Sequence, residues 1–186
     1  MNNKVWKIND STKKTGKKTK QTQGSNATKN GKDKQETVAS VLEVGFGKSS
    51  EVIRYKALWY KKQLNRADVY YDNWNLLVEV KSQAIGGSAD VKMFAEIDNA
   101  FRQLLYSEKK PKPDRSIKSK NNTIKNWWLV LDGSYFKENN CLCKKAREIV
   151  KDNCSIYGVN KNRVKIINGI KELSNEIIKF KENVNE

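Results

Sequence analysis

Runs of apolar, β-branched and aromatic residues along the chain predict five strands. The first three runs follow one another with short turns between them, which predicts an antiparallel meander. A long helical segment separates the third run from the fourth, and a connection of that length is typical of two parallel strands. The predicted strands span residues 52–60, 67–71, 75–83, 126–131 and 163–167.

Apolar residues that recur at spacings of three and four predict helices between and around these strands. The clearest helix carries Phe94, Ile97 and Phe101, and an earlier one begins near Lys32 and stops at Gly45. The pattern predicts an α/β (or α+β) chain in which a mixed five-stranded sheet is flanked by helices. The predicted helices span about residues 32–45, 91–107, 138–152 and 170–180.

The third predicted strand carries two charges in an otherwise apolar run. Side chains alternate between the faces of a strand, so Glu79 and Lys81 project on one face and the neighbouring valines on the other. Asp68 belongs to the preceding strand, and a tight turn between the two strands brings Asp68 and Glu79 towards the same end of a hairpin. Two carboxylates that converge beside a lysine are suited to hold a hard divalent cation with a water next to it.

The composition narrows the chemistry that this chain can perform. It has 186 residues and a formal net charge of +16, which indicates a polyanionic partner: nucleic acid first, an anionic membrane surface second. The absence of histidine excludes Ser-His-Asp and Cys-His catalysis, so acid–base or metal chemistry rests on Asp, Glu, Lys or Tyr. Three cysteines, with no apolar leader and no membrane-spanning run, predict reduced thiols in a cytoplasmic protein.

Two basic stretches lie outside the predicted elements. Between Asn9 and Asn30 the only apolar residue is Ala27, which predicts a disordered arm over residues 1–31 ahead of a folded domain at residues 32–186. The arm is interpreted either as a non-specific phosphate contact or as a solubilising tail. The proline-marked stretch 108–126 is interpreted as a DNA-contacting loop. Its candidate DNA-binding residues are Lys109, Lys110, Lys112, Arg115, Lys118 and Lys120.

Asp68, followed by Glu79-Val80-Lys81, resembles the PD-(D/E)xK signature of the restriction-endonuclease-like nuclease superfamily. The sequence departs from that signature at Ala67, where the family pattern has proline. The segment from Ser82 to Leu104 resembles some type II restriction enzymes, in which a glutamine follows the lysine closely and a small-residue loop leads into a helix. The resemblance covers roughly residues 31–132 and implies the superfamily's core, a mixed five-stranded sheet between helices.

The resemblance also implies roles for individual residues. Asp68, Glu79 and the Val80 carbonyl are expected to hold Mg²⁺, for which Mn²⁺ can substitute. Lys81 is expected to orient or deprotonate the attacking water, and Gln83 on the same strand face is a further catalytic candidate. Glu36 on the first helix is expected to lean towards the metal, although it serves equally well as an acid favouring a helix N-terminus. Asp72 competes with Asp68 as the first carboxylate.

A type II restriction endonuclease is the first functional expectation. Such an enzyme cleaves double-stranded DNA at a specific sequence, works as a homodimer on a symmetric site, and is accompanied by a cognate DNA methyltransferase. A structure-specific nuclease of repair or recombination with the same fold is the alternative. A basic nucleic-acid-binding protein without catalysis is the third reading, although a chain that binds phosphate has little reason to bring two carboxylates together unless a cation sits between them.

Overall fold

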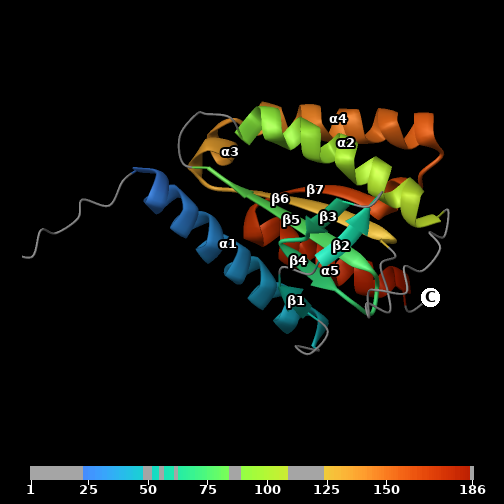
Figure 1. Ribbon diagram of the computed structural model, residues 1–186, viewed down its shortest axis with the longest axis horizontal. Helices are drawn as coiled ribbons and strands as arrows, with labels where there is room; N and C mark the ends of the chain where they lie inside the picture. Colours follow the sequence, from blue (N-terminus) through green and yellow to red (C-terminus); the bar gives the residue numbers. More distant parts are fainter. Residues whose placement is uncertain are drawn as a thin grey trace, which may run out of the picture.

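The computed structural model describes residues 23–47, 52–54, 57–60, 63–83, 89–108 and 124–184. These residues form an α/β fold in which a mixed sheet lies between two layers of helices (Figure 1). The predicted α/β class, with a mixed sheet flanked by helices, is therefore confirmed. Among the described residues, every helix is too short or too polar to span a lipid bilayer. The predicted DNA-contacting residues Lys109, Lys110, Lys112, Arg115, Lys118 and Lys120 lie outside the described residues.

The sheet has the strand order β1-β4-β5-β6-β7. β4 runs antiparallel to β5, whereas β5, β6 and β7 are mutually parallel, and the short strand β1 pairs antiparallel with the outer edge of β4. The predicted parallel pairing of the Glu79 strand with the strand that follows the long helix is confirmed. The strands are β1 (Val52–Arg54), β4 (Val69–Tyr71), β5 (Leu76–Ser82), β6 (Asn126–Asp132) and β7 (Val164–Asn168).

The single strand predicted over residues 52–60 is wrong. It is two strands: β1, and β2 (Ala57–Tyr60), which pairs with β3 (Gln63–Arg66) in a separate hairpin. The reason lies in the length of β4. Arg54 is paired with Val69, the first residue of β4, so β1 uses the full length of β4. The backbone groups of β2 pair with those of β3 instead.

Helices cover both faces of the sheet. α1 (Gln23–Phe46) and α5 (Gly169–Val184) cover one face, and α2 (Ala89–Glu108) and α4 (Asn140–Tyr157) lie side by side on the other (Figure 1). The alternation along β5 explains this division: Val78 and Val80 are buried with α1 and α5, and Leu77 is buried with α2 and α4. Two shorter helices, α3 (Ser134–Glu138) and the 3₁₀ helix η2 (Lys161–Arg163), complete the fold.

α1 begins earlier than the sequence predicts. It starts at Gln23, so the boundary predicted at residue 32 falls inside a helix, and residues 1–22 of the predicted arm lie outside the described residues. The packed part of α1, around Val38 and Leu42, explains the difference. Once these residues fix the first turns, each added residue gains one hydrogen bond without a new nucleation cost, so a polar segment can extend the helix.

Candidate active site

Asp68, the residue that precedes β4, lies opposite Glu79 of β5. Val69 of β4 is paired with Val78 of β5, so the antiparallel register, continued by one residue, places Asp68 across from Glu79. Asp68 Oδ2 accepts the backbone N–H of Val80 at 2.8 Å. Val80 lies beyond the stretch of β5 that pairs with β4, and the Asp68 carboxylate supplies the hydrogen-bond partner of its N–H. The side chain of Glu79 is only 13% exposed, so the pair lies largely out of water.

α1 contacts this pair through Gln35. Its Nε2 donates to Asp68 Oδ1 at 2.7 Å, which fixes the second oxygen of the carboxylate. Glu36, the residue of this helix that was expected to lean towards the metal, is exposed, and a role for it at a metal site stays a prediction. Gln35 lies three residues before the buried Val38, on the same stripe of the helix, whereas Glu36 is rotated by about 100° from Gln35.

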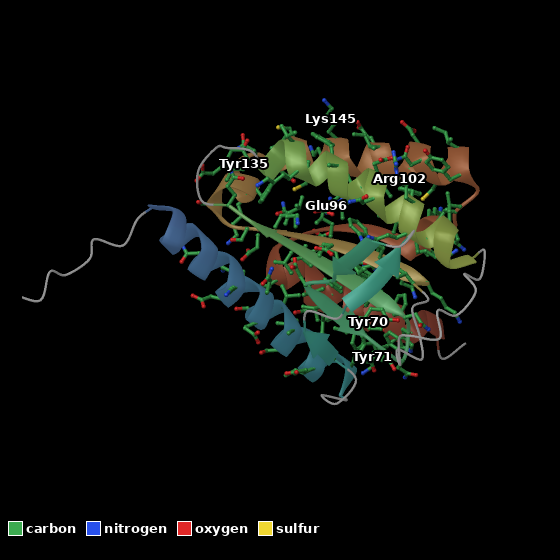
Figure 2. All side chains as sticks on the ribbon, viewed as in Figure 1. Tyr70, Tyr71, Glu96, Arg102, Tyr135 and Lys145 are labelled. Carbon is green, nitrogen blue, oxygen red and sulfur yellow. The ribbon has the colours of Figure 1, made fainter. Side chains whose placement is uncertain are left out.

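Lys81 lies on the same side of β5 as Glu79 and between two carboxylates. Its Nζ is 3.9 Å from Glu79 Oε2 and 3.0 Å from Glu96 Oε1. Glu96 belongs to α2, and Figure 2 shows it on the side of α2 that faces the sheet. Glu96 is not among the site candidates predicted from the sequence. The available signal was its spacing, because Glu96 follows the buried Met93 by three residues and precedes the buried Ala100 by four.

Burial and like charge shift the ionisation of this cluster. Burial raises the pKa of Glu79 well above its usual value, and the charge of Asp68 raises it further. The pKa of Asp68 is also raised by burial, although the Val80 N–H and the charge of Lys81 oppose the shift. Burial alone would lower the pKa of Lys81, but the charges of Glu79 and Glu96 outweigh it and raise that pKa. Two buried carboxyl groups that resist joint ionisation are stabilised by a cation.

The donor set at this cluster suits a hard cation. Within the described part of the chain, no three or more acidic or cysteine side chains are grouped so as to hold a metal ion by themselves. Asp68 and Glu79 provide two carboxylates, and Val80, whose N–H donates to Asp68, has its carbonyl on the same edge of β5 by strand geometry. Mg²⁺ is commonly bound in this way, through one or two carboxylates, with water and substrate phosphate oxygens completing its octahedral shell. The residues present therefore fit Mg²⁺.

The two remaining site candidates from the sequence, Asp72 and Gln83, lie beyond the two ends of β5. Asp72 belongs to the turn that enters β5 at Leu76, about 10 Å along the strand from Glu79, so Asp68 is the carboxylate that meets Glu79. The backbone of Gln83 ties the end of β5 to the next corner of the fold: its N–H donates to the Asp132 carbonyl and its carbonyl accepts the Tyr135 N–H. A catalytic role for the Gln83 side chain stays a prediction.

A second contact between α1 and the sheet lies beside the first. Lys34, the neighbour of Gln35, has its Nζ 2.8 Å from Oδ2 of Asp132, a buried carboxylate at the end of β6. Burial would raise the pKa of Asp132, but the hydrogen bond and charge of Lys34 outweigh it and hold that pKa below its usual value. Consecutive residues of α1 therefore hold Asp68 and Asp132, which fixes the helix at the carboxyl ends of β5 and β6.

Comparisons with protein-family models, with curated proteins and with solved structures gave no match for this chain.

Proposed function

We propose that this protein is a Mg²⁺-dependent endonuclease that hydrolyses phosphodiester bonds of double-stranded DNA, as a type II restriction enzyme does. One observation carries the proposal. Asp68, just before β4, lies opposite Glu79 of the adjacent strand β5, and Lys81 lies on the same side of β5 as Glu79. The PD-(D/E)xK signature, which this sequence resembles, calls for two acids and a lysine placed in this way. The mixed sheet between helices supports the further proposal of a restriction-endonuclease-like core.

The chemistry proposed for the site divides between the carboxylates and the lysine. Asp68, Glu79 and the Val80 carbonyl hold Mg²⁺ (or Mn²⁺), which when bound polarises the scissile phosphate and lowers the pKa of a coordinated water. Gln35 and the Val80 N–H fix both oxygens of Asp68, so the carboxylate is oriented before substrate arrives. Lys81 orients the attacking water and offsets the negative charge that develops on the phosphate oxygens.

The charge of the chain supports DNA as the substrate. A formal net charge of +16 attracts a polyanion, and this attraction is independent of base sequence. Two close carboxylates would repel phosphate without a cation between them, so the acidic pair in a basic chain favours catalysis over binding alone. We further propose a homodimer acting on a symmetric site in the cytoplasm, with a DNA methyltransferase as its companion in the same system.

The test is incubation of the purified protein with unmethylated plasmid or phage DNA and, separately, with a branched DNA junction, in Mg²⁺. The controls are EDTA and the Lys81→Met variant. The proposal expects discrete duplex fragments from the wild type and intact DNA in both controls. Cleavage of the junction alone would instead identify a structure-specific nuclease. A mobility shift without cleavage in Mg²⁺ or Mn²⁺ would overturn the catalytic proposal and leave a DNA-binding protein.

A further inference from the structure

Lys81 lies near carboxylates from two different elements. Glu79, two residues before it on β5, lies 3.9 Å from its Nζ, and Glu96 of α2 lies 3.0 Å from it. The closer carboxylate is therefore the one that comes from the helix. All three side chains are mostly buried, with 22% of Lys81 and 28% of Glu96 exposed, so water screens these contacts less than at the surface.

An ammonium group and a divalent cation compete for the same carboxylate oxygens. The Lys81 side chain is long and flexible, and a small rotation would bring its Nζ into contact with Glu79. In that position it would neutralise the Asp68–Glu79 pair and occupy the space where a cation binds. A second contact is therefore needed that keeps the Lys81 ammonium near the site without letting it bind Asp68 and Glu79. The 3.0 Å contact with Glu96 does this.

We propose that Glu96 is a positioning residue that holds the Lys81 ammonium away from Asp68 and Glu79, so that these two carboxylates stay open to a divalent cation. The identity of the cation as Mg²⁺ rests on the proposed function. The inference itself concerns cation binding rather than cleavage. It gives a role to an acid on the sheet-facing side of α2, where a simple amphipathic helix would carry an apolar residue (Figure 2).

The test is a double-mutant cycle read by calorimetric titration with Mg²⁺ and Mn²⁺ in the absence of DNA. Glu96→Gln is expected to weaken Mg²⁺ binding about 10-fold or more in the wild-type background, because the released Lys81 ammonium would compete with the cation for the two carboxylates. In the Lys81→Met background the same substitution is expected to change the affinity less than about 3-fold, because the competing ammonium is gone. The matched control is Asp98→Asn, which removes a carboxylate from the exposed side of α2 and should leave the affinity unchanged.

Glu96→Asp separates positioning from charge. It keeps the negative charge but is one methylene shorter, so it is expected to weaken Mg²⁺ binding as Glu96→Gln does. Equal losses from Glu96→Gln in both backgrounds, or wild-type affinity in Glu96→Asp, would overturn the proposal, because Glu96 would then act through its charge or as a ligand itself. A wild type that binds neither cation also overturns it. Cation binding with the expected cycle but no cleavage of any DNA would leave this inference standing and overturn the proposed function.

Discussion

Gln35 Nε2 donates a hydrogen bond of 2.7 Å to Asp68 Oδ1, joining a helix to a carboxylate 33 residues further along the chain. The other oxygen of Asp68 accepts the Val80 N–H, so the carboxylate is held from two directions. A side chain fixed in this way loses little conformational entropy when a ligand binds. α1 thus contributes to the candidate site although it contributes no charge to the pair.

Gln35→Ala is expected to lower Mg²⁺-dependent DNA cleavage by about 10- to 100-fold, because outer residues that orient a metal ligand have effects of this size. The measurement is the initial rate of cleavage at saturating DNA. Thr37→Ala, an exposed position on the same helix, is the control and should keep the wild-type rate. An unchanged rate in Gln35→Ala would show that Asp68 needs no support from α1.

Glu79→Gln is expected to abolish cleavage while raising the melting temperature by a few degrees at pH 7. The glutamine amide has the same shape as the carboxyl group but carries no charge. Burial and the charge of Asp68 disfavour ionised Glu79, so the substitution removes this cost. Because the pKa of Glu79 is raised in the fold, the cost of ionising it grows as the pH rises above its usual value of 4.5 and disappears below it. Thermal unfolding without metal should therefore show a gap that narrows as the pH falls. A lower melting temperature for Glu79→Gln at pH 7 would contradict this account.

Asp132→Asn is expected to lower the free energy of unfolding by about 1–3 kcal/mol at pH 7, since it removes a charged hydrogen bond from a buried site. The pKa of Asp132 is lowered in the fold, so its contribution is present above its usual value of 3.8 and is lost as the pH falls through the lowered value. Urea unfolding of wild type and variant between pH 7 and pH 3 measures this difference. A gap that stays constant over that range would show that the Lys34 contact is not its source.

Gly133→Ala is expected to destabilise the fold strongly. Gly133 has φ 107°, and an added Cβ would lie 2.2 Å from the backbone oxygen of Gln83, which cannot move without disturbing the end of β5. Gly158→Ala is the matched control, because that glycine also has a positive φ but an added Cβ there meets nothing within 4 Å. The control should lose about 1–2 kcal/mol in urea unfolding from backbone strain alone. Equal losses in the two variants would contradict the close approach to Gln83.

Much of the candidate site could be predicted from the sequence because it depends on the alternation of a single strand. Glu79 and Lys81 are two residues apart in an apolar run, and this spacing places them on one side of β5 whatever the rest of the fold does. The short turn between β4 and β5 was enough to bring Asp68 to Glu79. These inferences need only local geometry.

The contributions from helices could not be predicted in the same way, because they depend on how each helix is rotated against the sheet. One residue along α1 changes the direction of a side chain by about 100°, so the choice between Gln35 and Glu36 required the packing of Val38 and Leu42. The contact of Glu96 with Lys81 could not be predicted for the same reason, because it depends on how α2 is rotated against the sheet. The β2–β3 hairpin could not be predicted either. β1 pairs with β4, and the length of β4 decides where β1 ends.

The most direct test of the central claim compares two Glu→Gln variants in one assay of unmethylated phage DNA with Mg²⁺. Glu79→Gln removes a carboxylate from the candidate site, and Glu148→Gln removes one from an exposed position of α4. The account predicts Mg²⁺-dependent fragments from the wild type and from Glu148→Gln, with a rate at least about 1,000-fold lower for Glu79→Gln. Equal cleavage by both variants, or none by the wild type, would contradict the assignment of Asp68, Glu79 and Lys81 as a nuclease site.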